Sequence, residues 1–355
     1  MAQRVSVGRS ERSRDLATSV AIGLGALVAA SWVRRRLAAR AYTFDGRVVL
    51  ITGGARGFGL ALARQFAEQG ATIVLVSRTA DELERARLEL VRCGATVDVA
   101  VCDVRDPDRV TRLVRGIVEA HGQLDVVVNN AGVIQMMPFA RATPEDFRES
   151  LDTHFWGPFH VIRAALPHLI ERRGSIVNIS SFGGRIAVPH LLPYCVGKFA
   201  LTALSEGLHA ELGGDGVHVL TVTPGLMRSG SHRNVRVRGR RAAEATWFGM
   251  GTVSSLTSMN VDRAARQVVA ALRQRRARIT PGVQARVALA ADALAPELVA
   301  SIVQLVDRVL PSAVGKDARA EAVWSRDLDL GWAARLMPTR AAMAMNQPVA
   351  ADERR

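Results

Sequence analysis

The sequence predicts an α/β fold, a doubly wound parallel sheet within a single main domain. Two observations predict it. A short β-branched run, RVVLITG at 47–53, leads directly into a glycine-rich turn and a helical segment, and strand-like and helix-like segments then alternate. With 355 residues, 48% of them hydrophobic, the chain can bury a core of about 250 residues and still carry extensions. We therefore expect an N-terminal tail at 1–44, the main domain at 45–282 and a C-terminal helical extension at 283–355.

The tail contains an apolar stretch, Leu16 to Val33, of 18 residues without a charge. As a helix it would span about 27 Å, just short of a typical hydrocarbon core, so we expect a membrane-associated helix of marginal length. Four arginines precede the stretch and four follow closely, so the charge rule gives no orientation. A cleaved signal peptide and a helix docked on the protein are the alternative interpretations.

The first strand ends in a glycine-rich loop, TGGARGFG at 52–59, which a helical segment follows. Gly53, Gly57 and Gly59 would allow a tight turn and a close approach of the backbone to a pyrophosphate at the helix amino terminus. The next strand, at 72–77, is followed by Arg78 and not by the acid that binds the adenosine ribose of NAD. Arg56 and Arg78 could together hold a ribose 2′-phosphate, which favours NADP(H) over NAD. The alternative is that both are ordinary solvated arginines.

Four further segments continue the alternation, a helix at 81–94, a strand at 96–104, a helix at 107–122 and a strand at 124–132. Repeated strand–helix–strand units imply a parallel sheet with right-handed crossovers. Asp103 and the stretch Asn129 to Gly132 fall at carboxyl ends of strands, the edge where such sheets bind ligands. Each of these residues could also be a helix cap or a turn residue.

Three residues later in the chain are candidates for catalysis, Ser181, Tyr194 and Lys198. Tyr194 and Lys198 stand four positions apart at the start of an apolar, helix-compatible run, so they would share one helix face. An ammonium close to a phenol lowers the pKa of the phenol toward working pH. Of the 47 basic residues only Lys198 and Lys316 are lysines, which sets position 198 apart. Ser181, after the strand-like run at 175–180, could donate a hydrogen bond to the substrate oxygen with which Tyr194 exchanges a proton. The alternative is that Tyr194 and Lys198 lie on an ordinary helix surface without a catalytic role.

Composition excludes several classes of protein. The three cysteines are too few for a disulfide framework and match no metal-site spacing, so we expect a reducing compartment and no metal. The formal net charge of +14 is uneven, because 228–280 contains 12 arginines against two acidic residues. These arginines are not interleaved with aromatic residues in any recognised nucleic-acid motif, so we expect no nucleic-acid partner and favour an anionic membrane surface or a phosphorylated ligand.

Over about residues 45–280 the chain resembles the short-chain dehydrogenase/reductase family, because six motifs occur in the order in which that family has them. They are TGGARGFG at 52–59, CDV with Asp103, NNAG at 129–132, Ser180 and Ser181, YCVGK at 194–198, and Pro224 with Gly225. The resemblance implies a Rossmann-like domain that moves a hydride between a nicotinamide ring and a carbonyl or alcohol carbon.

The resemblance also implies roles for individual residues. Tyr194 would be the general acid in reduction and the base in oxidation, and Ser181 would polarise the substrate oxygen. Lys198 would lower the pKa of the tyrosine and hold the nicotinamide ribose. The residues implied at the cofactor are Thr52, Gly53, Arg56, Gly57, Gly59, Arg78, Asp103, Val104, Asn129, Ala131, Gly132, Tyr194 and Lys198, with Pro224, Gly225 and Ser229 closing the loop over the nicotinamide.

One position departs from the family pattern. Where the family has an asparagine that serves a water-linked proton relay to the lysine, this chain has His154. A histidine can donate and accept hydrogen bonds, but its bulk and its titration near neutrality would rearrange the water or make activity depend on pH. The alternative is a packed helix histidine without a catalytic part.

The rest of the chain predicts the substrate side. The segment 226–260, which mixes Trp247 and Phe248 with arginines, is expected to form an amphipathic lid, and 283–310 is apolar enough to bury one face, with a break at Pro296. We therefore expect an NADP(H)-dependent oxidoreductase for a lipophilic carbonyl or secondary alcohol, in the cytoplasm or at the cytoplasmic face of a membrane, with homo-oligomerisation left open. The alternatives are an NAD-dependent alcohol dehydrogenase and a nicotinamide-binding protein with little turnover, such as a redox sensor or an assembly partner.

Overall fold

The computed structural model describes residues 42–254, 257–311, 321–328 and 344–347, together with Gly23 and Ala26. Apart from those two residues, the predicted membrane-associated helix at Leu16 to Val33 lies outside the described residues. No helix in the described ranges is both long enough and apolar enough to cross a membrane. The chain divides into two compact units, Met1–Thr43 with Arg273–Arg275, and Phe44–Leu272 with Arg276–Arg355, and the second contains the sheet and the cavity described below.

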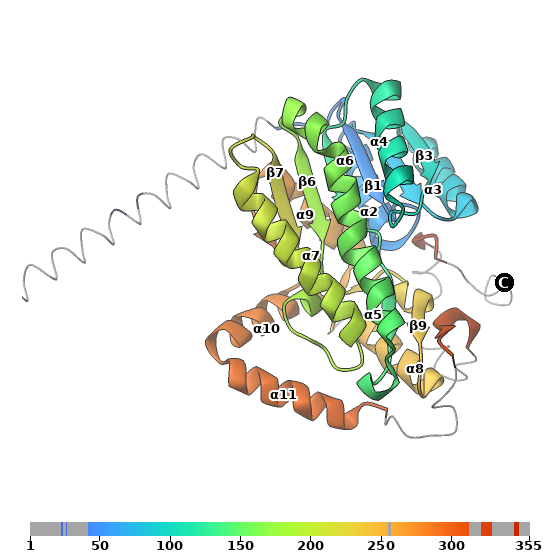
Figure 1. The fold of residues 1–355 in the computed structure, drawn as a ribbon, viewed down its shortest axis with the longest axis vertical. Helices are drawn as coiled ribbons and strands as arrows, with labels where there is room; N and C mark the ends of the chain where they lie inside the picture. The colour runs from blue at the N-terminus through green and yellow to red at the C-terminus, as the bar shows by residue number, and fades with distance from the viewer. Residues whose placement is uncertain are drawn as a thin grey trace, which may run out of the picture. The chain divides into compact units, whose positions relative to one another are not determined.

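A seven-stranded parallel sheet forms the centre of the second unit, in the order β11, β7, β6, β4, β1, β2, β3 (Figure 1). The strands are β1 (Val48–Thr52), β2 (Thr72–Ser77), β3 (Val97–Val101), β4 (Val126–Asn129), β6 (Ser175–Ile179), β7 (His218–Val222) and β11 (Arg278–Ile279). From β1 the chain builds outward to β2 and β3, then crosses back to β4 on the other side of β1. This order confirms the predicted doubly wound fold and puts the topological switch point between β1 and β4.

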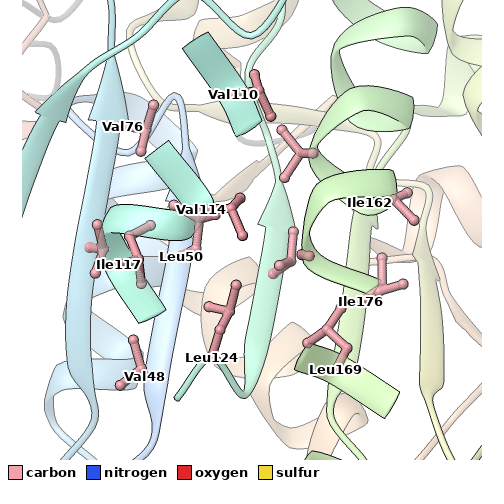
Figure 2. Packing of buried hydrophobic residues seen from close by; sticks show 14 of the residues in the cluster. Val48, Leu50, Val76, Val110, Val114, Ile117, Leu124, Ile162, Leu169 and Ile176 are labelled. Carbon is pink, nitrogen blue, oxygen red and sulfur yellow. The ribbon is translucent and has the colours of Figure 1, made fainter. Parts of the chain in front are cut away.

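Helices cover both faces of this sheet, which explains why β1, β4, β6 and β7 are buried along their whole length. In Figure 1, α4 (Pro107–His121), α6 (Gly157–Arg172) and α7 (Leu192–Glu211) lie in front of the sheet, and α2 (Gly57–Ala67) and α9 (Val261–Arg273) lie behind it; α3 (Ala80–Arg92) joins β2 to β3. Val114 of α4 and Leu169 of α6 belong to one buried cluster with strand residues such as Leu50 and Ile176 (Figure 2). The apolar runs that predicted strands therefore form the core.

Smaller elements surround the carboxyl ends of the strands. A three-stranded sheet joins β5 (Ile134–Met136), β9 (Val235–Val237) and β12 (Val323–Trp324), and β8 (Leu226–Arg228) pairs with β10 (Ser258–Asn260). Among the described residues, the helical elements here are α5 (Pro144–Leu151), a π-helix (Asp152–Trp156), α8 (Arg241–Val253), and short 3₁₀ helices at Phe139–Arg141, Phe182–Gly184, Ser231–Asn234 and Ser325–Asp327. The segment predicted to be a lid thus contains β8, β9, α8 and β10, and β12 pairs with it from the C-terminal extension.

The C-terminal extension begins with α10 (Val283–Leu294) and α11 (Pro296–Val309), so the predicted break at Pro296 is confirmed. The predicted burial of one apolar face is not observed among the described residues. Of all side chains on the two helices only that of Ala285 is buried, and Leu298, Ile302 and Leu305 are between 50% and 59% exposed. The apolar pattern of these three residues fits a covered face, but among the described elements only α10 packs extensively against α11.

Candidate active site

A cavity of about 470 Å³ lies at the carboxyl ends of the strands. Its walls come from the glycine-rich loop, the ends of β2, β3, β4 and β6, the start of α7 and the segment 226–260. The predicted site residues that line it are Gly53, Arg56, Gly57, Arg78, Asp103, Val104, Ala131, Gly132, His154, Ser181, Tyr194, Lys198, Pro224, Gly225 and Ser229. The structure therefore brings together residues from eight motifs and connections spread over almost 180 positions, whereas Thr52, Gly59 and Asn129 do not line the cavity.

Thr52 and Asn129 support the lining from behind. Thr52 Oγ1 accepts hydrogen bonds from the main-chain N–H groups of Asn130 and Ala131, at 3.0 and 3.1 Å. Asn129 Nδ2 donates to Asn178 Oδ1 at 2.9 Å, which links β4 to β6 inside the sheet. Both side chains are buried, so they hold the loop after β4 in place without facing the cavity.

The glycine-rich loop forms a cradle in which side chains would not fit. Gly53 and Gly57 have φ values of +62° and +56°, in the left-handed region that favours glycine. A Cβ atom on Gly59 would lie 2.2 Å from the carbonyl oxygen of Gly53, so only glycine lets α2 start this close to the loop. The cavity therefore meets bare backbone next to the amino terminus of α2, and this cradle fits a pyrophosphate.

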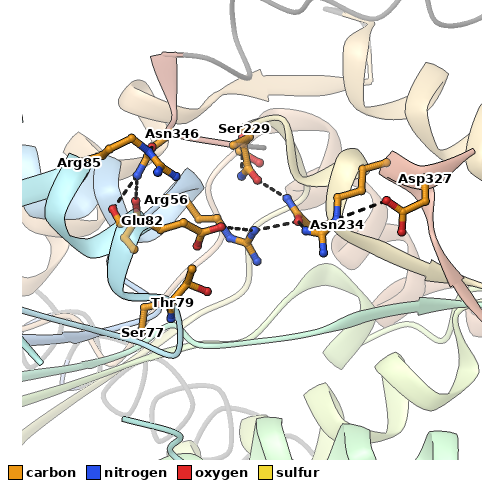
Figure 3. Close-up of polar contacts among 12 residues, drawn as sticks. Arg56, Ser77, Thr79, Glu82, Arg85, Ser229, Asn234, Asp327 and Asn346 are labelled. Atoms are coloured by element: carbon orange, nitrogen blue, oxygen red, sulfur yellow. Dashed lines mark hydrogen bonds and ion pairs between the residues drawn. The ribbon is translucent and has the colours of Figure 1, made fainter. Parts of the chain in front are cut away.

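Two guanidinium groups lie beside this cradle. Arg56 Nη1 forms an ion pair with Glu82 at 3.3 Å and donates to Asn234 Oδ1 at 2.8 Å (Figure 3). Burial lowers the pKa of Arg56, and the Glu82 carboxylate acts in the opposite direction. Arg78 also lines the cavity, is exposed, and has no hydrogen-bond or ion-pair partner in the part of the chain that the structure describes. The donor set suits a phosphate, and Arg78 is the guanidinium that forms no ion pair with which a phosphate would compete among the described residues.

At the other end of the cavity, Ser181, Tyr194 and Lys198 meet. Ser181 Oγ accepts from the N–H of Gly183 at 3.1 Å, which leaves its own hydrogen free to donate. Ser181 also forms a hydrogen bond with the Tyr194 side chain. Lys198 Nζ lies 5.8 Å from the centroid of the Tyr194 ring and donates to the carbonyl oxygen of Ile179 at 2.8 Å. The geometry confirms that α7 brings the tyrosine and the lysine to one face.

The electrostatics differ from the expectation that Lys198 lowers the pKa of Tyr194. Burial raises the pKa of the Tyr194 phenol, and the hydrogen bond with Ser181 only partly opposes this. Burial also lowers the pKa of Lys198 to about 7. The physical reason is that both groups lie away from water, so that a charge on either loses hydration. A phenolate and an ammonium formed together would relieve this cost for each other.

The low pKa of Lys198 predicts how stability depends on pH. An unfolded chain keeps this ammonium protonated up to about pH 10.4, so between about 7 and 10.4 the unfolded state binds more protons than the folded state. The contribution of Lys198 to the free energy of unfolding therefore increases as pH rises through that window. We expect the difference in unfolding free energy, wild type minus Lys198→Met, to increase between about pH 7 and pH 9 in urea titrations. A difference that stays constant over this range would contradict a buried ammonium.

His154 is packed tightly beside the catalytic candidates. It is fully buried, its Nε2 accepts from the N–H of Val133 at 3.2 Å, and its ring meets the Tyr194 ring edge to face at 5.4 Å between centroids. Because Nε2 is an acceptor, Nδ1 carries the proton and faces Ser150 Oγ at 3.3 Å. Burial, and secondarily the charge of Lys198, lowers the pKa of His154 well below its usual value. The expected titration near neutrality is therefore wrong, since the imidazole stays neutral there.

Two glycines make room for this larger side chain. A Cβ atom on Gly132 would lie 2.9 Å from Nε2 of His154, and one on Gly197 would lie 2.9 Å from its Nδ1. The π-helix Asp152–Trp156 holds His154 between the loop after β4 and α7. The imidazole thus joins the loop after β4 through a hydrogen bond and packs against Tyr194 of α7.

Several lining residues were missed by the sequence analysis. Asn130 donates through Nδ2 to the carbonyl oxygens of Thr52 and Gly53, at 3.1 and 3.0 Å, and the signal for it was its place in the NNAG motif. Gln347 also lines the cavity, although it lies far beyond every motif, and no sequence signal pointed to it.

Comparison with known proteins places these features among relatives. A family model described as short chain dehydrogenase matches residues 47–238. The 11-beta-hydroxysteroid dehydrogenase 1A of Arabidopsis thaliana is 39% identical over 188 residues, which covers 52% of this chain and 53% of that protein. The match covers 53% of this relative and 60% of a dehydrogenase/reductase SDR family protein 7-like of Anopheles gambiae, so it spans between half and two thirds of their own length.

Solved structures share the fold. A short chain dehydrogenase/reductase from Burkholderia phymatum in complex with NAD matches with a TM-score of 0.67 and 25% identity, over 72% of this chain and 96% of the other. A metagenomic short-chain oxidoreductase in complex with NADP matches with a TM-score of 0.55 and 27% identity, over 68% of this chain and 100% of the other.

Proposed function

Because the chain belongs to the short-chain dehydrogenase/reductase family, we propose that it is an NADP(H)-dependent oxidoreductase acting on a lipophilic carbonyl or secondary alcohol, with Tyr194 as general acid and base. One observation carries the proposal: Ser181, Tyr194 and Lys198 meet at one end of a cavity whose other end is the glycine cradle. Consumption of NADPH with a panel of hydrophobic ketones and aldehydes tests it. If no member of the panel is turned over, the proposed activity is wrong.

The chain's own groups handle the proton. In reduction, a bound nicotinamide cofactor would supply the hydride to the carbonyl carbon. Tyr194 gives its phenolic proton to the carbonyl oxygen, to which Ser181 also donates a hydrogen bond. The Lys198 ammonium stabilises the phenolate that remains. The new negative charge in turn raises the pKa of Lys198, so the ammonium keeps its proton. Oxidation of the alcohol reverses each step.

The walls near Tyr194 support an apolar substrate. Ile134, Val188, Leu191, Trp247 and Phe248 line the cavity there. The aromatic pair from α8 is held in place because Trp247 Nε1 donates to the buried carboxylate of Glu244 at 2.9 Å. The similarity to a hydroxysteroid dehydrogenase agrees with a substrate of this polarity.

The nucleotide end supports NADP(H) over NAD. Ser77 ends β2 and Arg78 follows it, where an acid would bind the ribose hydroxyls of NAD, and no carboxylate among the described residues forms an ion pair with Arg78. Arg56 is the weaker candidate because Glu82 already neutralises part of its charge. We therefore assign the 2′-phosphate contact mainly to Arg78.

Arg78→Ala is expected to lower kcat/KM for NADPH by about 10- to 100-fold, the usual worth of a charge-assisted hydrogen bond, and to leave the value for NADH unchanged. Steady-state kinetics with both cofactors measures this. Arg87→Ala is the matched control, since Arg87 pairs with Glu84 on the exposed side of α3 and does not line the cavity. An equal loss for both cofactors would contradict the assignment of Arg78 to the phosphate.

The cellular location remains a proposal. The apolar stretch Leu16 to Val33 suits the surface of a membrane, and the exposed apolar side chains of α11 would suit either a membrane surface or a second copy of the chain. We place the protein at the cytoplasmic face of a membrane or in the cytoplasm, because both locations give it access to a cytosolic nicotinamide cofactor.

A further inference from the structure

Four residues near the carboxyl end of the chain, Ala344–Gln347, lie across the glycine-rich loop, and we refer to them as the strap. The carbonyl oxygen of Met345 accepts from the N–H of Gly57 at 2.8 Å. Asn346 Nδ2 donates to the carbonyl oxygen of Ala55 at 2.7 Å, across 291 positions of sequence. The strap therefore contacts the part of the loop that forms the cradle.

The strap is also attached to the two helices that follow the loop. Asn346 Nδ2 donates to the carbonyl oxygen of Glu82 at 2.9 Å, and its Oδ1 accepts from Arg85 at 2.9 Å, so that one amide holds two residues of α3 (Figure 3). Arg64 of α2 donates to the carbonyl oxygen of Ala344 at 2.5 Å. These main-chain and side-chain hydrogen bonds to the glycine-rich loop, α2 and α3 fix the position of the strap.

Gln347 connects the strap to the opposite wall of the cavity. Its Nε2 donates to the carbonyl oxygen of Ser229 at 3.0 Å, on the segment predicted to close over the nicotinamide. At this point the two walls are close, because a Cβ atom on Gly57 would lie 2.8 Å from Gln347 Nε2 and 3.9 Å from the Ser229 oxygen. The strap thus spans the cavity from the glycine-rich loop to the 224–229 segment.

The strap also positions Arg56 indirectly. Gln347 Oε1 accepts from Asn234 Nδ2, and Asn234 Oδ1 in turn accepts from Arg56. Without Gln347, the Nδ2 of Asn234 loses its partner and only Arg56 and Arg326 remain on its Oδ1, so the Asn234 amide beside Arg56 is less firmly oriented.

The chemistry of the strap indicates closure and not competition with a nucleotide. A segment that imitated the phosphates of a dinucleotide would carry carboxylates, but the strap, AMNQ, presents carbonyl oxygens and neutral amides. The cavity of about 470 Å³ is present with the strap in place, and of the four residues only Gln347 lines it. The strap takes up the N–H of Gly57 but leaves the rest of the cavity open, so a cofactor held by the remaining groups of the cradle can occupy the site together with the strap.

We propose that the strap closes the nucleotide end of the cavity over bound NADP(H) and controls the rate at which the cofactor leaves. This inference rests on the proposed function, because it takes the occupant to be a nicotinamide cofactor. A dinucleotide held between two walls that the strap joins cannot leave until the hydrogen bonds of Asn346 and Gln347 break, so their loss shortens the residence time.

The test is the dissociation rate of NADPH, followed by stopped-flow fluorescence when an excess of NADP⁺ displaces it. In the full chain carrying Asn346→Ala and Gln347→Ala, we expect dissociation at least about tenfold faster than in wild type, which corresponds to one lost hydrogen bond. Gln304→Ala removes the same type of side chain from the exposed surface of α11 and should leave the rate unchanged. Deletion of 344–355 removes the strap completely and should give at least the same increase, whereas deletion of 348–355 keeps it and should not.

The outcomes separate the two proposals. If wild type binds NADPH and the strap variants release it at the wild-type rate, the closure is wrong and the proposed function stands. Slower release or tighter binding in the variants would mean that the strap competes with the cofactor, which also overturns the closure. If wild type binds neither NADPH nor NADH while the deletion of 344–355 does, the strap blocks the site and the closure is again wrong. If no variant binds either cofactor, the proposed function fails and the closure fails with it.

Discussion

Tyr194→Phe is expected to lower kcat/KM for the carbonyl substrate by at least about 100-fold, because the phenolic proton is the one that the substrate oxygen receives. Phenylalanine keeps the ring and its edge-to-face contact with His154, so the fold and the cavity shape should persist. Binding of NADPH, measured by fluorescence titration, should be little changed. The loss should therefore appear in kcat.

The chain provides a matched control for this change. It contains only two tyrosines, and the other one, Tyr42, does not line the cavity. Tyr42→Phe removes the same hydroxyl and should keep turnover close to wild type. If Tyr194→Phe retains turnover within about tenfold of wild type, Tyr194 is not the general acid.

Gly59→Ala is expected to abolish measurable NADPH binding and to destabilise the protein by about 2–3 kcal/mol. The new methyl group would lie 2.2 Å from the carbonyl oxygen of Gly53, and because the obstacle is backbone it cannot turn aside as a flexible side chain would. The start of α2 and the cradle must then move apart. Isothermal calorimetry with NADPH and thermal unfolding measure the two effects.

Gly116→Ala controls for the general effect of adding a methyl group to a helix. Gly116 lies within α4, where an added Cβ would meet no atom within 4 Å. Alanine is the better helix former, so a gain of about 0.5–1 kcal/mol is expected. Wild-type affinity for NADPH in Gly59→Ala would contradict the account of the cradle.

The fold and the cradle could be predicted because their signals are local. The run 47–53, the glycines after it and the helix that follows are adjacent in the chain, and the alternation that predicted the parallel sheet recurs every few tens of residues. Tyr194 and Lys198 are also local, since helical geometry alone brings residues four apart to one face. These predictions needed no knowledge of distant contacts.

The rest of the site depends on contacts between distant segments, which no local pattern reveals. The departure at His154 was visible in the sequence, but its neutral state follows from burial between Gly132 and Gly197, which lie 22 positions before it and 43 after it. The low pKa of Lys198 has the same origin in desolvation. The strap is four residues without a hydrophobic pattern, and only the fold shows that it reaches the glycine-rich loop.

The central claim is that this chain transfers a hydride between a nicotinamide ring and a lipophilic carbonyl carbon. The most direct measurement uses NADPH deuterated at the transferable position with a panel of hydrophobic ketones and aldehydes, and analyses the products by mass spectrometry. The account predicts that wild type and Tyr42→Phe form an alcohol that carries one deuterium on the former carbonyl carbon. With Tyr194→Phe, the rate at which this alcohol forms should be at least about 100-fold lower. Binding of NADPH without a deuterated product from any member of the panel would contradict it and would favour a nicotinamide-binding protein without turnover.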